Sequence, residues 1–185
     1  MSTSAALQTC PCQINPASET TTAPLLYKDC CRPYHDSLLN KEADKTDGVQ
    51  AETAERLMRT RYSAFVLIKP EYIVKTTLPA QQSLLDVTAI EDWAKQTPWA
   101  GLEIIQHTPK LGKRHAQVEF KAFYTTADAQ QAAHHERSTF VKIKDEAVNE
   151  TWFFLDPTVA MSVTQKQPCI CGSGEKFKRC CGMYV

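Results

Sequence analysis

All eight cysteines of this 185-residue chain lie near its two ends, and no cysteine occurs between residues 31 and 169. At the C-terminal end, four of them fall within thirteen positions, in the sequence CICGSGEKFKRCC. Thiols this close together form either disulfide bridges or a metal site. The two clusters consist of Cys10, Cys12, Cys30 and Cys31, and of Cys169, Cys171, Cys180 and Cys181.

A disulfide framework is the first alternative, and it fits poorly. The N-terminus lacks the basic and apolar regions of a secretory signal, so we expect a cytoplasmic protein with reduced thiols. No run of about 18 apolar residues is present, so we expect no membrane span. Neighbours such as Cys30 and Cys31 are also poorly spaced for a local bridge, because adjacent Cα atoms lie only about 3.8 Å apart.

Zinc explains the C-terminal cluster better. A structural zinc ion takes four ligands in a tetrahedron, and the spacing C-x-C-x8-C-C supplies two thiols on each side of a turn. Gly172 and Gly174 permit positive φ in that turn. We expect Ser173 to cap a short helix over residues 174–181, ended by Gly182. An iron–sulfur cluster is the alternative metal centre, since iron also accepts four thiolates.

The N-terminal cluster is a stretched copy of the same pattern. Aligned on the paired cysteines, Tyr27 stands where Phe177 stands, and Lys28 where Lys178 stands. Seventeen residues separate Cys12 from Cys30, against eight in the C-terminal copy, and the glycine turn is missing. A longer loop costs only about 0.6 kcal/mol per doubling, so we expect a second zinc here. His35 is the alternative fourth ligand, or else an imidazole beside the site.

The C-terminal sequence resembles the SEC-C motif, the zinc module at the C-terminus of the SecA preprotein translocase motor. The likeness covers the cysteines, the GSG turn, Phe177 and the basic residues around it. It implies zinc held by Cys169, Cys171, Cys180 and Cys181. The corresponding module of SecA itself implies contact with an acidic chaperone and with ribosomes or lipid head groups.

The middle of the chain predicts helices followed by strands. Residues 41–50 are charged and lack apolar periodicity, so they read as a linker. Helical spacing of apolar residues follows over 51–68, with shorter helices over 70–77, begun by Pro70, and 86–96, capped by Asp86. The period then changes to two, which predicts strands at 99–108, 115–126, 134–143 and 151–156. Helices on a curved antiparallel sheet make an α+β fold, the architecture of an NTF2-like cone.

The segments RLMRTRYSAFV, HERSTF and WFFLD, enclosed by two SEC-C-like ends, resemble the YchJ-like family of bacterial proteins. That resemblance covers essentially the whole chain and implies an NTF2-like domain between two zinc modules. It predicts a zinc module at 1–40, a linker at 41–50, the central domain at 51–160 and the second zinc module at 161–185. The family implies no established activity.

Catalytic candidates in the middle of the chain form no motif. The polar residues that could serve a pocket are Arg59, Arg61, Tyr62, Tyr72, His107, Glu119, His135, Glu136, Arg137 and Asp156. We expect Arg61 to be buried and paired with a carboxylate such as Glu119 or Glu136. By strand alternation His135 and Arg137 share one face, and His134 and Glu136 share the other. Trp93, Trp99 and Trp152 are predicted to lie in the core.

Two functional hypotheses follow from these observations. The first is a non-enzymatic zinc protein whose ends are structural and dock a protein partner, with the basic residues Lys176, Lys178 and Arg179 facing it. The second is a cone that binds a small molecule or acts as an isomerase or dehydratase, which requires a sizeable apolar pocket with converging polar groups. Twenty-one basic residues balance 21 acidic ones, which argues against nucleic acid as a partner.

Overall fold

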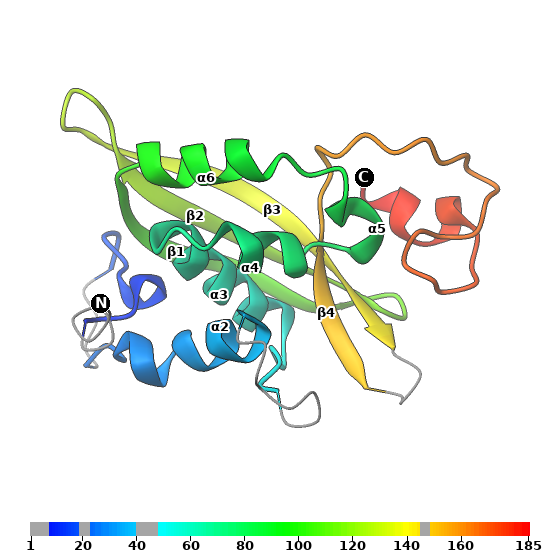
Figure 1. The fold of residues 1–185 in the computed structure, drawn as a ribbon, viewed down its shortest axis with the longest axis horizontal. Coiled ribbons are helices and arrows are strands. Elements are labelled where there is room, and N and C mark those ends of the chain that lie inside the picture. Colours follow the sequence, from blue (N-terminus) through cyan, green and yellow to red (C-terminus); the bar gives the residue numbers. More distant parts are fainter. Residues whose placement is uncertain (1–7, 19–22, 40–47, 145–148) are drawn as a thin grey trace.

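The computed structural model describes residues 8–18, 23–39, 48–144 and 149–185 (Figure 1). A four-stranded antiparallel sheet in the order β1-β2-β3-β4 forms one layer, as the sequence predicts. Its strands are β1 (Trp99–Leu111), β2 (His115–Thr125), β3 (Gln131–Lys144) and β4 (Glu150–Leu155). The helices are α2 (Arg32–Leu39), α3 (Ala54–Val66), α4 (Pro70–Lys75), α5 (Pro79–Gln82) and α6 (Val87–Gln96).

Local signals in the sequence explain where the helices begin. The side chain of Thr53 accepts a hydrogen bond from the Arg56 backbone at the start of α3, and Asp86 caps α6 in the same way. Pro70 occupies the first turn of α4, where its missing N–H costs nothing. The predicted helices at 51–68, 70–77 and 86–96 are therefore present with slightly shorter bounds.

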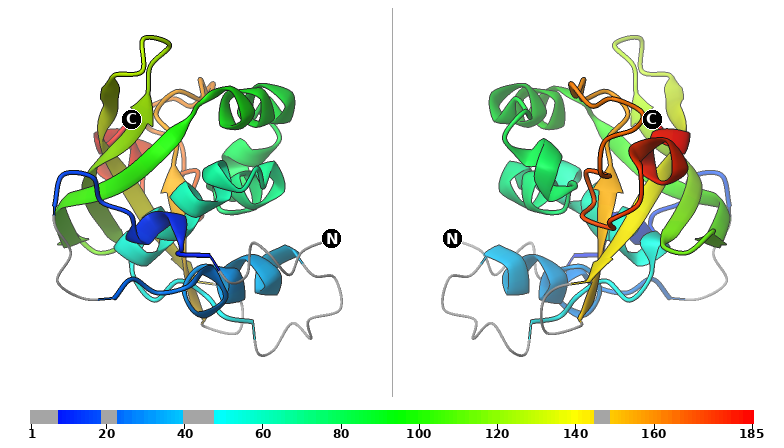
Figure 2. Two further views of the ribbon diagram at one scale, coloured as in Figure 1. Left: turned by 90° about the vertical axis from the view of Figure 1, so that its left-hand side faces the viewer. Right: turned by 90° about the vertical axis from the view of Figure 1, so that its right-hand side faces the viewer.

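The helices α3, α4 and α6 all lie on one face of the sheet, as the two side views show (Figure 2). Helix α3 contacts β1, β2 and β4, and its buried residues Leu57, Met58 and Tyr62 join the main core with Val118 and Phe140 from the sheet. Helix α6 packs less closely against the rest of the protein, since Ala94 is its one buried residue. Space is therefore left between α6 and the sheet.

Both chain ends pack against this central body. The N-terminal cysteines belong to the same buried cluster as Leu57 and Phe140. The C-terminal cysteines belong to a second buried cluster with Leu78, Val141 and Leu155. Figure 1 shows the described N-terminal segment, in blue, on the left-hand side of the molecule and the C-terminal segment, in red, on the right-hand side. Neither cysteine cluster hangs free of the sheet and helices.

The structure differs from the sequence-based expectation in several local elements. The helix expected over 174–181 is wrong: the chain instead makes two single 3-10 turns, η3 (Phe177–Arg179) and η4 (Cys181–Met183). Gly174 has φ of +75°, which an α-helix does not accommodate. Helices α2 and α5 were not anticipated. Of the linker expected at 41–50, residues 41–47 lie outside the described part of the chain, and 48–50 form no helix or strand.

Candidate functional site

The four N-terminal thiols converge on one point. The Sγ atom of Cys12 lies 3.6 Å from that of Cys10 and 3.5 Å from those of Cys30 and Cys31, and the Cys30 and Cys31 sulfurs are 3.9 Å apart. In a tetrahedron with Zn–S distances of about 2.3 Å, the sulfurs lie about 3.8 Å apart. The spacing of the thiols therefore matches a four-sulfur zinc site without further movement.

The C-terminal thiols make a second group of the same kind. All four Sγ atoms lie within 4.8 Å of one another, and those of Cys171 and Cys180 are 3.5 Å apart. All eight cysteines are buried, and none forms a disulfide, although every one lies in the described part of the chain. The disulfide alternative, which the sequence disfavours, therefore does not apply to this structure.

The two clusters share one backbone framework. In each cluster the backbone N–H of the first cysteine donates to the carbonyl oxygen of the residue two positions before an aromatic residue. Cys10 donates to Leu25 at 2.9 Å, and Cys169 donates to Glu175 at 2.8 Å. Aromatic residues Tyr27 and Phe177 each open a 3-10 turn and accept a hydrogen bond from the first of the paired cysteines. The predicted equivalence of Tyr27 and Phe177 is thus built into the backbone, and the longer N-terminal loop leaves it intact.

Gln13 replaces the missing glycine turn of the N-terminal cluster. Its backbone N–H donates to the Cys10 carbonyl at 2.9 Å, as that of Gly172 does to the Cys169 carbonyl at 3.0 Å. Gly172 and Gly174 have φ of +73° and +75°, so the C-terminal turn does use the glycine conformation. The side-chain amide nitrogen Nε2 of Gln13 also lies 3.7 Å from each of the Cys12 and Cys30 sulfurs.

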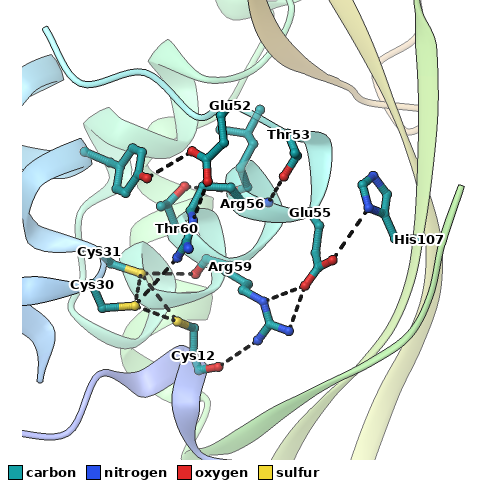
Figure 3. A network of polar contacts seen from close by, with 12 residues as sticks. Cys12, Cys30, Cys31, Glu52, Thr53, Glu55, Arg56, Arg59, Thr60 and His107 are labelled. Atoms are coloured by element: carbon teal, nitrogen blue, oxygen red, sulfur yellow. Dashed lines mark hydrogen bonds and ion pairs between the residues drawn. The ribbon is translucent and has the colours of Figure 1, made fainter. Parts of the chain in front are cut away.

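Helix α3 supplies the remaining contacts of the N-terminal cluster (Figure 3). The Ser63 hydroxyl lies 3.6 Å from the Cys10 sulfur, and the Arg56 guanidinium donates to the Cys30 sulfur at 3.8 Å. Arg59 donates to the Cys12 carbonyl at 3.1 Å and pairs with Glu55 at 2.8 Å. Such outer contacts orient metal ligands and offset the negative charge of the thiolates.

The C-terminal cluster is held by its own turn and by the sheet. The Ser173 hydroxyl donates to the Cys180 sulfur at 3.5 Å, and the Cys181 backbone N–H donates to the Cys169 sulfur at 3.4 Å. From β2, the His115 Nε2 lies 3.5 Å from the Cys181 sulfur. Ser173 therefore contacts a sulfur and does not cap a helix.

Each cluster favours at least one thiolate. Hydrogen bonding with the Cys181 thiol, opposed by burial, lowers the pKa of Cys171 to about 4. The Cys12 thiol is the main contact that lowers the pKa of Cys10 to about 7. Because thiolates are the metal-binding form of cysteine, this electrostatic environment suits a cation.

His35 lies beside the N-terminal cluster and outside its set of converging sulfurs. Its Nδ1 is 2.8 Å from the Tyr27 hydroxyl and its Nε2 is 2.9 Å from the Thr60 carbonyl oxygen, so both ring nitrogens are occupied. Burial lowers the pKa of His35 to about 4. In this structure the imidazole ties α2 to α3, which favours the second of the two roles that the sequence left open.

A cavity of about 750 Å³ lies between α3, α6 and the sheet. Strand alternation directs Phe120 and Ala122 of β2, and His134, Glu136 and Ser138 of β3, toward it. Aromatic side chains supply much of the rest of its wall: Tyr62, Phe65, Trp93, Trp99 and Phe154. The cone is therefore hollow, which the second functional hypothesis requires.

Arg61 is buried, as predicted, but the expected ion pair is wrong. Its Nη1 donates to the Ile73 carbonyl at 2.8 Å and to the hydroxyls of Thr76 and Thr77 at 2.7 and 3.2 Å. Among the described residues no carboxylate lies within ion-pair distance of it. Glu119 is unreachable because the pleat turns it to the opposite face of the sheet, where it pairs with His135 and Arg137.

The other candidates divide between the two faces of the sheet. Tyr62, Glu136 and Asp156 line the cavity with Arg61. His107 lies 3.6 Å from Glu55 outside the cavity. His134 contacts Glu136 at 2.9 Å, and His135 and Arg137 both contact Glu119 on the other face. The two predicted pairs, each sharing one face of the sheet, are therefore correct. Trp93 is 45% exposed and lines the cavity, so its prediction as a core residue is wrong, whereas Trp152 is buried.

Comparisons with known proteins place the chain in one family. Residues 53–157 match the family model of the YchJ middle NTF2-like domain. Residues 2–39 match the N-terminal zinc-binding domain of YchJ family proteins, and residues 166–182 match the SEC-C motif. With the two cysteine tetrads described above, these matches place zinc at both ends of the chain.

Whole-chain relatives agree with the family models. A UPF0225 protein of Actinobacillus succinogenes is 45% identical over 95% of this chain and 97% of its own length. One from Haemophilus influenzae is 44% identical over 100% of this chain and 98% of its own.

Two solved structures are also similar. A crystal structure of a SEC-C motif containing protein from Psychrobacter arcticus is 69% identical, with a TM-score of 0.93 over 98% of this chain and 99% of that one. The solution structure of a SEC-C motif containing protein from Rhodopseudomonas palustris is 28% identical, with a TM-score of 0.58 over 72% of this chain and 91% of that one. Sequence relatives, family models and fold agree that the chain belongs to the YchJ family, UPF0225, with an NTF2-like central domain between two zinc-binding ends.

Proposed function

We propose that this protein binds a small organic molecule in its central cone and that the two zinc sites hold the walls of the cone together. The observation that carries the proposal is the cavity of about 750 Å³, which falls within the size range of ligand sites, about 300–1,000 Å³. Its lining is mainly apolar, with a few polar groups such as Arg61 and Glu136. The proposal is one of binding, and it assigns no catalytic residue.

Each of the eight cysteines, in this proposal, gives its sulfur to zinc. Four thiolates fill the tetrahedral coordination of the ion, which leaves no position for substrate or water. The role we infer is therefore structural: zinc ties two chain ends, which bury few apolar residues of their own, onto the sheet. We keep the divisions 1–40, 41–50, 51–160 and 161–185 as part of the proposal.

A second candidate function is docking of an acidic protein partner at the C-terminal zinc site. While its thiols are buried, Lys176, Lys178 and Arg179 are exposed. Glu175 is the one acidic residue of 166–185, and it lies 3.7 Å from Lys113. These charges support a basic surface on a chain with no net charge. The resemblance of this site to the SecA zinc module supports a chaperone, a translocase or a ribosome as the partner in this second proposal.

We also propose the cytoplasm as the site of action, because the eight unbridged cysteines suit a reducing compartment. In the described part of the chain, no helix combines the length and apolarity needed to cross a bilayer.

Binding of the neutral dye N-phenyl-1-naphthylamine tests the cavity. We expect its fluorescence to rise with the wild-type protein and to be lost in Ala122→Phe, which fills the cavity from β2. Lys121→Ala, one residue away on the other face, is the matched control and keeps binding. A dye that binds equally to all three proteins, or to none of them, contradicts the proposal.

Metal content tests the ligand set. Elemental analysis of protein purified under reducing conditions is expected to give two zinc ions per chain. Cys31→Ser and Cys181→Ser are each expected to lose one. Iron in place of zinc, or full zinc content in either variant, would refute the assignment.

Charge reversal at Lys176, Lys178 and Arg179 tests the docking candidate without removing the zinc site. We expect an acidic partner recovered with the wild-type chain to be lost from a pull-down with this variant. An unchanged set of partners contradicts docking at this surface.

A further inference from the structure

Building on the proposed ligand site, we infer that the cavity selects a small organic monoanion, a carboxylate carried on a flat apolar ring system, and that Arg61 binds the carboxylate. Among the residues that the structure describes, no carboxylate lies within ion-pair distance of this arginine. The inference concerns the class of ligand, so it can fail while the cavity remains a binding site.

Arg61 has an unused donor edge. Its Nη1 is occupied by three oxygen acceptors, whereas Nε and Nη2 donate to no acceptor within the described residues. Neither nitrogen is completely buried, although the residue as a whole is only 6% exposed. Because Arg61 lines the cavity, this unused edge is the part of its guanidinium that remains for a ligand. The Nε–Nη2 edge of a guanidinium matches the two oxygens of a carboxylate.

The guanidinium is also held in place before any ligand arrives. It lies over the Phe154 ring at 4.5 Å from the ring centroid, in addition to its bonds with Ile73, Thr76 and Thr77. Burial lowers the pKa of Arg61 to about 10, which leaves the group charged at neutral pH. A buried charge with no counterion in direct contact is unfavourable, and an anionic ligand that contacts it relieves that cost. Such a preorganised cation favours anion binding.

The three carboxylates that line the cavity are already engaged, and Asp86 accepts a hydrogen bond from the Ala89 backbone N–H where it caps α6. Glu136 accepts one hydrogen bond from the Ser138 hydroxyl and lies 2.9 Å from His134, and Asp156 accepts from the backbone N–H and the hydroxyl of Thr158. Asp156 and Glu136 act on Arg61 through space without contacting it. These carboxylates repel every negative charge on a ligand, and direct contact with the single Arg61 guanidinium can offset this for one charge only, which is why we infer a monoanion.

Aromatic side chains around the cavity suit a flat ring. Trp93 and Trp99 pack edge to face at 5.1 Å, and Phe65 lies 4.9 Å from Trp93. Phe120 adds a ring from the sheet. Aromatic faces and edges of this kind bind planar apolar rings through stacking and edge contacts.

Competition between two matched probes tests the ligand class. The probes are 2-naphthoate and its neutral isostere 2-naphthamide, each used to displace N-phenyl-1-naphthylamine from the wild-type protein at neutral pH. We expect the acid to displace the dye at about tenfold or more lower concentration than the amide, as a charge-assisted bidentate contact predicts. In Arg61→Gln we expect this preference to vanish while dye binding remains. Arg137→Gln, on the opposite face of the sheet, is the control and keeps the preference.

The outcomes separate the two proposals. Absence of dye binding to the wild-type protein refutes the ligand-binding function and this inference with it. Dye binding with equal displacement by acid and amide refutes the anion preference alone. If Arg61→Gln does not fold, the wild-type comparison still decides the preference, and Arg61→Lys tests the bidentate contact. An acid preference undiminished in a folded Arg61→Gln, or in Arg61→Lys where Arg61→Gln does not fold, places the anion elsewhere and overturns the assignment.

Discussion

The guanidinium Nη1 of Arg59 lies 3.1 Å from the backbone carbonyl oxygen of Cys12. A side chain of α3 therefore fixes the turn that carries two of the four N-terminal thiols. The same arginine is oriented by Glu55 at 2.8 Å (Figure 3). This contact links the first zinc site to a helix that also forms a wall of the cavity.

Arg59→Met is expected to weaken the affinity of the N-terminal site for zinc, while the purified protein still contains two zinc ions per chain. Loss of contacts around metal ligands typically weakens metal affinity about 10–100-fold. Transfer of one of the two zinc ions to a colorimetric chelator should become about tenfold or more faster. Arg32→Met, which removes an exposed ion pair with Asp36, is the control and should leave the transfer rate unchanged. Equal rates in wild type and Arg59→Met would argue against the role of Arg59.

Gly101→Ala should destabilise the packing of the N-terminal segment on β1. Gly101 has φ of +150°, and an added Cβ would lie 2.5 Å from the Pro16 side chain and 2.7 Å from the Ile14 carbonyl oxygen. We expect a loss of about 2–4 kcal/mol in the free energy of unfolding, from strain and overpacking together. Chemical denaturation of the zinc-loaded protein measures it.

The control for that substitution is Gly112→Ala. Gly112 has φ of +60°, and a Cβ there meets no atom within 4 Å, so only backbone strain of about 1 kcal/mol is expected. A loss at Gly101 no larger than the loss at Gly112 would show that the close approach of Ile14 and Pro16 is unimportant.

His35→Leu is expected to destabilise the protein without removing zinc. The change leaves the buried Tyr27 hydroxyl and Thr60 carbonyl without their partner, at a cost of about 2–4 kcal/mol. Zinc content and unfolding free energy are measured on the same sample. Loss of one zinc per chain would instead make His35 a ligand.

The pH dependence of stability gives a separate test of His35. Its folded pKa of about 4 lies below its ordinary value of about 6.5, so the unfolded chain binds more protons between these values. Stability that His35 contributes is present above about pH 6.5 and is lost as pH falls toward 4, by at most about 1.4 kcal/mol per pH unit. His35→Gln should show a weaker fall over this window than wild type. A parallel fall in both proteins would contradict the assignment of this buried neutral imidazole.

Removal of zinc by a strong chelator should lower the melting temperature of the entire protein. Because the N-terminal cysteines share a buried cluster with Leu57 and Phe140, loss of metal exposes part of the main core. We expect a decrease of about 10 °C or more, since structural zinc contributes several kcal/mol and each kcal/mol corresponds to about 2–4 °C at this chain length. Differential scanning calorimetry measures the transition. An unchanged main transition would mean that the zinc ends fold independently of the cone.

Much of the local structure follows from the sequence because its signals are local. The Asp86 cap, Pro70 and the change of period near residue 98 define helices and strands through bonds between near neighbours. The helix predicted over 174–181 failed because the conformations of Gly174 and Cys180 serve the geometry of the sulfurs. The pairing of Arg61 failed for a different reason: which carboxylates it reaches depends on the faces of distant strands.

The sequence by itself determined the two cysteine tetrads, the class of metal that suits them, and the order of helices and strands between them. These depend on ligand chemistry and on periodicities that span a few residues. Only the tertiary structure decided that both clusters pack into the core, and that Trp93 and Arg61 line a cavity. Burial and pairing of side chains are set by contacts between segments far apart in the chain, and a pattern along the chain does not contain those contacts.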